Sequence, residues 1–124
     1  MEKGNHKMTE KIMQGIHAHI QDLSGFDQIE IVEIAPGRSR LKATVNESMK
    51  NLYGAIHGGA LYTLCDMAAG MTAYAYGVSN VTLSGNINYV RPARVGTVFI
   101  ECDTLHKGRS TIVQDVQIKD AEEK

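Results

Sequence analysis

Asp66 is the side chain whose surroundings in the sequence most clearly suggest chemistry. It lies in the almost unbroken apolar run of residues 59–76, where only Asp66 and Cys65 can be charged or reactive near neutral pH. A helix that is apolar on all sides is normally buried, and a carboxylate inside such a helix is costly unless it is paired or used. The sequence therefore predicts a long buried helix that carries Asp66 as a candidate functional residue.

A Gly-Gly pair, Gly58 and Gly59, stands where this helix is expected to begin, directly after His57. Backbone N–H groups at a helix N-terminus lack intrahelical partners and carry partial positive charge, and glycine lets a ligand oxygen come close to the backbone. This arrangement suits an oxyanion or a polarised thioester carbonyl. His57 and Asn51 can add hydrogen bonds there. Equally, His57 could serve only to order the turn, and the glycines only to allow close helix packing.

The spacing of these groups limits what one chain can do alone. Asp66 follows Gly59 by seven residues, which places both on one side of the helix, about 10 Å apart along its axis. A base or nucleophile and an oxyanion donor must both lie within about 3–4 Å of the same carbonyl carbon. Two antiparallel copies of the helix satisfy this condition. We therefore predict a homodimer whose active sites combine Gly58 of one copy with Asp66 of the other.

The whole chain has the size and charge of one ordinary domain, which we expect over residues 1–124. Its formal net charge of −1 gives no general attraction to nucleic acid or to anionic membranes. Residues 1–8 show no signal-peptide pattern and are expected to form a frayed leader. Cys65 and Cys102 lack the spacing of metal ligands, so we predict no metal, and two reduced cysteines favour a cytoplasmic protein.

The apolar run of residues 59–76 could also be considered as a membrane span. It is at the short end of the about 20 apolar residues that a bilayer requires. It also contains Asp66 in its middle and has no basic flanks. A buried helix of a soluble protein is therefore the better interpretation.

The segments around the long helix show the patterns of one further helix and several strands. Residues 9–23 place apolar side chains at helical spacing. Residues 28–35 and 38–46 alternate in hydropathy on either side of Pro36-Gly37, which predicts a hairpin. Further strands are expected at residues 80–90, 96–106 and 110–118. The predicted fold class is α+β, with a long central helix wrapped by a curved antiparallel sheet of five strands.

From about residue 28 to its end, the chain resembles the hotdog-fold acyl-CoA thioesterases of the phenylacetate-degradation (PaaI) type. The motif that carries this resemblance comprises Asn51, His57-Gly58-Gly59, Asp66, Thr82 and Tyr89-Val90-Arg91-Pro92-Ala93. The resemblance implies a hotdog fold and the hydrolysis of an acyl-CoA to a free acid and coenzyme A. Coenzyme A is then part of the substrate, and no separate cofactor is expected.

The same resemblance implies roles for individual residues and an assembly. Asp66 would act as general base or nucleophile, and the Gly58 amide would polarise the thioester carbonyl. Asn51 would assist, and Thr82 would position water. Members of this family form dimers of dimers, and their sheet has one more strand after the position at which this sequence stops.

Candidate substrate contacts come from the long helix and from two loops. The helix carries a narrow, more polar stripe formed by Gly59, Tyr62, Thr63, Asp66 and Gly70. Arginines suit the phosphates of coenzyme A, and the loops at strand ends supply Arg91 and Arg109, together with Arg94 and Lys107. Each of these charges could instead be an ordinary solvated loop charge, and Tyr62 could be a core residue.

Several other interpretations stay open. Asp66 could be a buried structural carboxylate, and Thr82 an ordinary strand threonine. Cys65 lies about 100° around the helix from Asp66, off the polar stripe, which argues against a cysteine nucleophile paired with His57. The domain could also bind acyl-CoA without hydrolysing it, or act as a hydratase, although the sequence contains no hydratase motif.

Overall fold

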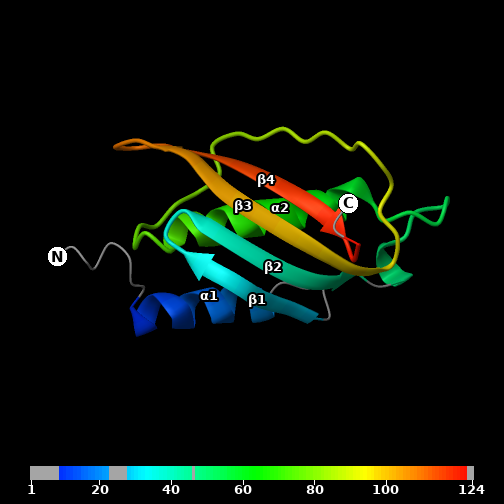
Figure 1. The fold of residues 1–124 in the computed structure, drawn as a ribbon, viewed down its shortest axis with the longest axis horizontal. Coiled ribbons are helices and arrows are strands. Elements are labelled where there is room, and N and C mark those ends of the chain that lie inside the picture. Colours follow the sequence, from blue (N-terminus) through cyan, green and yellow to red (C-terminus); the bar gives the residue numbers. More distant parts are fainter. Residues whose placement is uncertain (1–8, 23–27, 46, 123–124) are drawn as a thin grey trace.

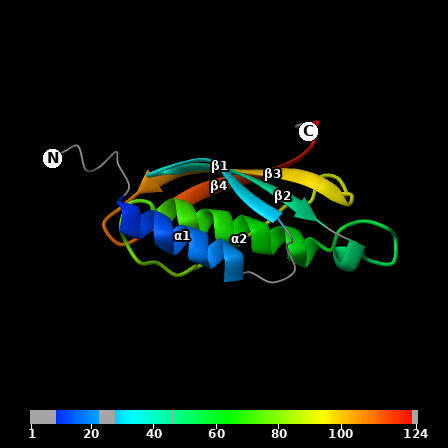
Figure 2. The same cartoon turned by 90° about the horizontal axis from the view of Figure 1, so that it is seen from below.

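In the part of the chain that the structure describes, a four-stranded antiparallel sheet carries two α-helices on one of its faces (Figures 1 and 2). The computed structural model describes residues 9–22, 28–45 and 47–122. In chain order the elements are α1 (Glu10–Asp22), β1 (Gln28–Ala35), β2 (Arg38–Val45), the short 3₁₀ helix η2 (Glu47–Met49), α2 (Gly58–Tyr74), β3 (Gly96–Lys107) and β4 (Ile112–Asp120). Figure 2 shows α1 and α2 side by side beneath the sheet.

The sheet follows the order of the chain, β1-β2-β3-β4, so each strand pairs with the next one along. β1 and β2 meet at the predicted turn, where Gly37 has a φ of 90°, a left-handed value that glycine adopts without strain. The register of β1 shifts between Ile31 and Glu33. This bulge moves the inward face by one position, which explains why Ile34, rather than Glu33, follows Ile31 on the buried side.

The core lies between the sheet and α2. The strands place alternate residues on this side, and the most deeply buried are Leu41, Ala43, Val45, Val98, Ile100 and Cys102. The facing side of α2 supplies Leu61, Leu64, Met67, Ala68 and Met71, at the spacing of three and four residues that defines one helix face. Ile16 attaches α1 to the same core and is only 1% exposed. Burial of one such large side chain stabilises a fold by about 1.5–3 kcal/mol.

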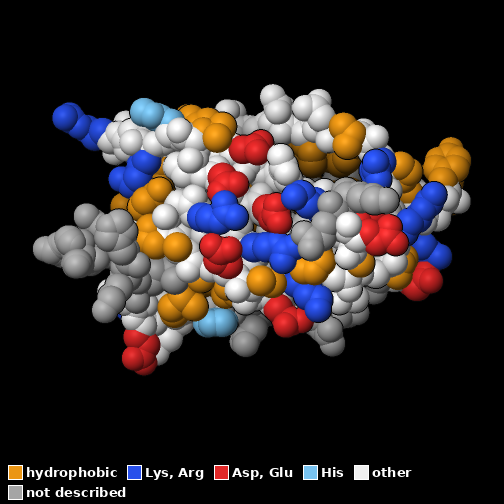
Figure 3. All heavy atoms as spheres, viewed as in Figure 1, with side chains coloured by type: hydrophobic (Ala, Val, Ile, Leu, Met, Phe, Trp, Pro, Cys, Tyr) orange, Lys and Arg blue, Asp and Glu red, His pale blue; other side chains and the backbone are white. Residues whose placement is uncertain are grey.

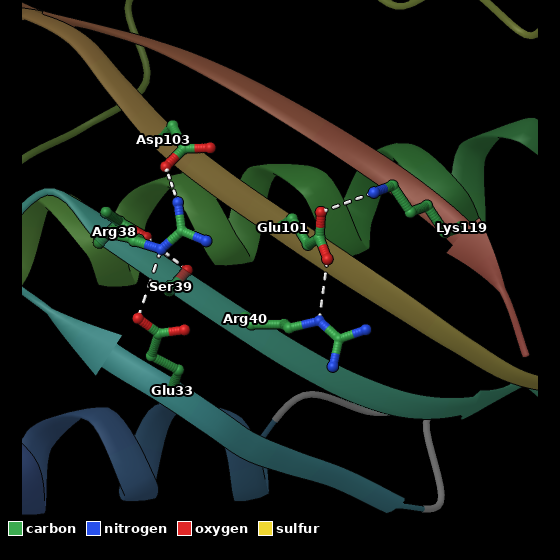
Figure 4. Close-up of polar contacts among 8 residues, drawn as sticks. Glu33, Arg38, Ser39, Arg40, Glu101, Asp103 and Lys119 are labelled. Atoms are coloured by element: carbon green, nitrogen blue, oxygen red, sulfur yellow. Dashed lines mark hydrogen bonds and ion pairs between the residues drawn. The ribbon is translucent and has the colours of Figure 1, made fainter. Parts of the chain in front are cut away.

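The opposite face of the sheet is charged, as the mixed blue and red surface in Figure 3 shows. Figure 4 shows the ion pairs that cross these strands. Glu101 accepts from Arg40 Nε at 2.9 Å and pairs with Lys119 Nζ at 3.0 Å. Arg38 lies between Asp103, at 2.6 Å, and Glu33, at 3.3 Å. The sheet therefore has one apolar and one polar face, which is typical of an antiparallel sheet covered on a single side.

The prediction of a strand at residues 80–90 is wrong for the described structure. Residues 78–95 form no regular element and run as an extended segment beyond the β4 side of the sheet (Figure 1). A strand requires a hydrogen-bonded neighbour, and β4, the nearest sheet edge, is separated from this segment by an open groove. The sheet consequently has four strands rather than the predicted five. The frayed leader at residues 1–8 and the implied strand after residue 124 both lie outside the described residues.

The prediction that the long helix is buried on all sides is also wrong for a single chain. The sheet covers one side of α2, whereas Gly59, Thr63 and Asp66 on the other side are exposed. The exposed side carries the more polar stripe that the sequence predicted. Asp66 belongs to this stripe, so the prediction that Asp66 is buried is also wrong for a single chain. Among the described residues, no helix is long and apolar enough to cross a membrane.

Candidate active site

The extended segment at residues 80–89 lies along one stripe of α2 and runs antiparallel to it. Asn80 Nδ2 donates to the Gly70 carbonyl oxygen at 3.2 Å, and Thr82 Oγ1 donates to Asp66 Oδ1 at 2.5 Å. Farther along, a Cβ at Gly85 would lie 2.5 Å from Tyr62 Oη, and Tyr89 Oη donates to the Gly58 carbonyl oxygen at 2.8 Å. The four helix positions, 70, 66, 62 and 58, are spaced four residues apart and therefore form one stripe. We call residues 80–89 the strap.

Asp66 lies near the middle of this stripe, with its carboxylate at the surface of the single chain. Thr82 Oγ1 donates to one carboxylate oxygen, Oδ1. Within the described residues, no other hydrogen bond to this carboxylate is present, so Oδ2 is accessible to a water molecule or a ligand. The structure thus brings together two of the predicted catalytic residues that lie sixteen positions apart in the sequence.

The first turn of α2 is held from outside the helix. Ile56 N donates to Ala93 O at 2.9 Å, and His57 N donates to Met49 O at 2.8 Å. The His57 carbonyl accepts from Ala60 and Leu61, which begins the helix. Among the described residues, the N–H groups of Gly58 and Gly59 donate to no acceptor. They are therefore available to a ligand oxygen, as expected for the start of a helix.

The side chains of His57, Asn51 and Thr63, the remaining predicted residues near this turn, differ in their hydrogen bonds. The His57 imidazole is exposed and provides no cap to the helix. Asn51 Oδ1 accepts from Tyr53 N at 2.9 Å and from Ala55 N at 3.1 Å, so its side-chain oxygen closes the loop before α2. Thr63 Oγ1 donates to the Gly59 carbonyl at 2.9 Å, within the helix. Of these polar groups, the His57 imidazole and the Asn51 side-chain NH₂ have no hydrogen-bond acceptor among the described residues.

An open groove of about 2220 Å³ lies between residues 78–95 and β4, with one side of α2 as its floor. Five of the predicted residues line it: Tyr62, Asp66, Thr82, Arg91 and Arg109. The other five lie outside the lining: Asn51, His57, Gly58, Gly59 and Thr63. The structure therefore divides the predicted site into a groove set and a helix-start set.

Arg91 and Arg109 lie toward opposite ends of α2. Arg91 is close in sequence to Ala93, which bonds Ile56 just before the helix. Arg109 follows Lys107, whose ammonium lies 5.1 Å from the Tyr76 ring just after the helix ends. A helix of 17 residues is about 25 Å long. One chain therefore does not bring the two arginines to a single phosphate group.

Cys65 adjoins Asp66 in sequence and also lines the groove, but its surroundings make the thiol a poor nucleophile. Burial raises the pKa of this thiol to about 11, with smaller contributions from Cys102 and Asp66. The thiolate is the nucleophilic form of cysteine, so this environment opposes nucleophilic catalysis. Both cysteines are free. No cluster of three or more His, Cys, Asp or Glu side chains able to hold a metal ion occurs among the described residues.

Tyr89 and Asn80 are contacts that the residue patterns did not reveal. Tyr89 belongs to the family motif, but its residue type and spacing indicate no contact, and the alternation of residues 80–90 predicts a strand. A signal was nevertheless present, since Gly58, Tyr62, Asp66 and Gly70 recur at intervals of four residues. This period marks a helix stripe on which a second segment can lie, although it does not identify that segment.

Comparison with known proteins places the fold and the site in a family. The thioesterase superfamily matches residues 53–124. Acyl-coenzyme A thioesterase PaaI from Escherichia coli K12 is 28% identical over 120 residues, covering 94% of this chain and 86% of that protein. The solved structure of E. coli PaaI superposes with a TM-score of 0.82 at 27% identity, covering 95% of this chain and 88% of that one.

Two streptococcal structures are similarly close. A hypothetical thioesterase protein from Streptococcus pneumoniae TIGR4, solved with coenzyme A, has a TM-score of 0.81 and 34% identity, covering 90% of this chain and 86% of that one. The smu.793 protein from Streptococcus mutans UA159, bound to acetyl CoA, has a TM-score of 0.77 and 31% identity, with 86% of each chain covered. This chain belongs to the thioesterase superfamily. The predicted hotdog fold and the predicted enzyme class, a thioester hydrolase, are thereby confirmed.

Proposed function

We propose that this protein is an acyl-CoA thioesterase in which Asp66 activates water or attacks the thioester itself. The observation that carries the proposal is the placement of Asp66. Its carboxylate is exposed on the floor of the groove, and Thr82 orients it with a hydrogen bond of 2.5 Å. A carboxylate with one oxygen held and the other open is suited to general-base or nucleophilic catalysis.

Two routes fit this geometry. As a base, Asp66 takes a proton from water while the water oxygen bonds to the thioester carbon; the C–S bond then breaks, and the thiolate takes up that proton. As a nucleophile, Asp66 bonds to the thioester carbon and expels the thiolate, and water then hydrolyses the mixed anhydride. A single turnover in ¹⁸O-labelled water separates the routes. The base route labels only the product acid, whereas hydrolysis of an anhydride can also label the Asp66 carboxylate.

The oxyanion donor in this proposal is the Gly58 amide of a second copy. Gly58 and Asp66 are eight residues apart on one helix, or about 12 Å along its axis. No thioester carbonyl can contact both within a single chain. The free N–H groups of Gly58 and Gly59 and the exposed Asp66 all remain accessible to an antiparallel helix, with His57 and Asn51 at the same turn as additional donors.

Exposed apolar side chains on residues 78–95 support a homodimer. Val81 is 88% exposed, Leu83 is 85% exposed and Val90 is 91% exposed. These side chains project from an extended backbone that pairs with no strand of the described part of the chain, and such a surface is suited to pairing with another chain. A dimer of such dimers, as in the family, is the assembly we propose.

The proposed substrate contacts combine residues of the groove set from one copy with residues of the helix-start set from the other. In a composite site, Tyr62 and Arg91 or Arg109 from the groove of one copy would lie near Gly59 and Thr63 of the other. The arginines would bind coenzyme A phosphates. No separate cofactor takes part in the proposed reaction. We place the protein in the cytoplasm, because Cys65 and Cys102 are both free thiols.

The first experiment measures free-thiol release from aromatic, short, medium and long acyl-CoAs. Asp66→Asn keeps the side-chain shape but removes the base, and we expect it to lose most turnover with every accepted substrate. Asp103→Asn is the matched control, since Asp103 lies on the charged outer face of the sheet (Figure 4). Full activity of Asp66→Asn would refute the proposed role of Asp66. Saturable acyl-CoA binding without thiol release would instead identify a binding protein.

The composite site has its own test. Asp66→Asn and Gly58→Pro are purified separately, unfolded together in equal amounts and refolded as a mixture. Proline removes the N–H of residue 58 and is tolerated at the first position of a helix. In a mixed dimer of this kind, one of the two sites receives an intact Asp66 and an intact Gly58. Activity of about one quarter of the wild type is therefore expected from random pairing in a two-fold symmetric dimer. Activity no greater than that of the separate variants would contradict the shared site.

A further inference from the structure

Gly58 is enclosed by the ring of Tyr89 from the strap. Tyr89 Oη donates to the Gly58 carbonyl at 2.8 Å. A Cβ built on Gly58 would lie 2.9 Å from Tyr89 Cζ, closer than real Cβ contacts, and 3.0 Å from its Oη, which is tighter than most of them. At Gly59 the corresponding Cβ would meet nothing within 4 Å. Within this chain, a side chain at position 58 would therefore displace the end of the Tyr89 side chain, whereas the face of Gly59 stays open to a ligand.

Residues 89–93 hold the start of α2 at two points. Tyr89 Oη bonds the Gly58 carbonyl, and Ala93 O accepts from Ile56 N at 2.9 Å. No side chain caps the helix from His57, so these contacts replace a conventional N-cap in fixing the first turn. The strap, which ends at Tyr89, also reaches Asp66 through Thr82. The strap thus bonds to both helix positions, 58 and 66, at which the proposed catalytic groups lie.

We propose that Tyr89 is a positioning residue for the oxyanion donor. Its hydroxyl and ring set the direction of the Gly58 and Gly59 N–H groups, and a side chain at position 58 would displace the ring and break this hydrogen bond. This inference rests on the proposed thioesterase function for its catalytic consequence. Its structural part, the dependence of position 58 on Tyr89, holds independently of any activity. Tyr89 itself does not touch the reacting atoms.

The kinetic test compares the wild type with Tyr89→Phe, which removes only the hydroxyl. Without the hydroxyl, the N–H groups at the start of α2 should shift slightly from the position that the transition state requires. Such a shift weakens transition-state stabilisation more than substrate binding, so kcat should fall roughly tenfold or more with KM nearly unchanged. The pH dependence of kcat should keep its position, because Asp66 and Thr82 are untouched. The matched control is Tyr53→Phe, since Tyr53 is 86% exposed and should keep wild-type kinetics. A Tyr89→Phe enzyme with the wild-type kcat would overturn the proposal.

The structural test needs no substrate. Melting temperatures are measured for the wild type, Gly58→Ala, Tyr89→Leu and the double variant. Leucine ends before the ring atoms that a Cβ at position 58 would meet, so Gly58→Ala should lower the melting temperature clearly in the wild type and much less beside Tyr89→Leu. If Gly58→Ala lowers the melting temperature by the same amount in the wild type and beside Tyr89→Leu, the inference is overturned. If Gly58→Ala does not fold alone, recovery of folding in the double variant is the supporting result, and failure of both opposes it.

The two tests separate this inference from the proposed function. If the wild type releases no thiol from any acyl-CoA, the proposed function fails, and the melting cycle still decides whether Tyr89 determines the residue at position 58. If the wild type is active but Tyr89→Phe has full kcat, the proposed function stands and the positioning role is refuted.

Discussion

Thr82 donates a hydrogen bond to Asp66 across 2.5 Å, from an extended segment without a strand partner to the exposed face of α2. The strand-like alternation of residues 80–90 gives no hint of this contact, because the segment is held by the helix rather than by a sheet. The relationship makes the strap part of the proposed active site, since it supplies the hydrogen-bond donor that orients the carboxylate.

We predict that Thr82→Val lowers kcat for acyl-CoA hydrolysis by roughly ten- to a hundredfold. A hydrogen bond to a charged group is worth about 1.5–3 kcal/mol, and each 1.4 kcal/mol is about tenfold in rate. Valine has nearly the shape of threonine but cannot donate, so the carboxylate loses its orientation. Steady-state thiol release measures the effect, and Thr82→Ser, which keeps the hydroxyl, should retain most of the activity. Equal kcat for Thr82→Val and the wild type would contradict the role of this bond.

Cys65 should resist alkylation in the folded protein. Its pKa is raised from 9.0 to about 11, first by burial, so iodoacetamide at pH 8 should label it slower than an unfolded cysteine by roughly one to two orders of magnitude. Labelling should accelerate as the pH rises toward 11 and when urea unfolds the chain; mass spectrometry of the peptide that carries Cys65 reports both. In the same series, Cys65→Ser should keep wild-type kcat, and loss of activity in this variant would revive a cysteine nucleophile.

The buried hydroxyl pair between β2 and α2 should contribute to stability as a unit. Ser39 Oγ lies 2.7 Å from Thr72 Oγ1, and Thr72 donates its own hydrogen to Ala68 O, so Ser39 is the donor within the pair. Thr72→Val leaves the Ser39 hydroxyl buried without a partner, which should cost about 1–3 kcal/mol in the free energy of unfolding. Urea denaturation measures this loss. Adding Ser39→Ala should recover part of it, whereas Thr111→Val on the surface should change little; purely additive losses would contradict the pairing.

Glu101 should make the protein more sensitive to acid. Hydrogen bonds from Arg40 and then Lys119 hold the pKa of this carboxyl below its ordinary value of 4.5. A depressed folded-state pKa contributes stability that is present above pH 4.5 and is lost as the pH falls through the folded-state value. Urea unfolding at pH 7 and at successively lower pH should therefore show a smaller acid-dependent loss for Glu101→Gln than for the wild type. Glu30→Gln, at an exposed site on β1, is the control and should follow the wild-type curve.

Much of the fold was predictable because its signals are local. The alternation on either side of Pro36-Gly37 predicted β1 and β2 almost to the residue, and the apolar run after Gly58 predicted α2. The separation of Gly58 and Asp66 on one helix also followed from the sequence, because the rise of an α-helix is fixed. The register shift after Ile31 is also visible in the sequence, because Ile34 rather than Glu33 is the next apolar residue on the inward face. The catalytic roles of Asp66 and Gly58 stay predictions until the experiments above are done.

By itself, the sequence determined the two kinds of periodicity, the more polar helix stripe of Gly59, Tyr62, Thr63, Asp66 and Gly70, and the family to which these motifs belong. Only the tertiary structure decided what lies on that stripe. Residues 80–90 have the composition of a strand, but whether they join a sheet depends on the position of β4, which no local pattern contains. The contacts of Thr82 with Asp66 and Tyr89 with Gly58, and the separation of Arg91 from Arg109, likewise depend on how distant segments pass one another. Such relationships are set by the packing of the whole chain, since chemical type and spacing describe only neighbours along the backbone.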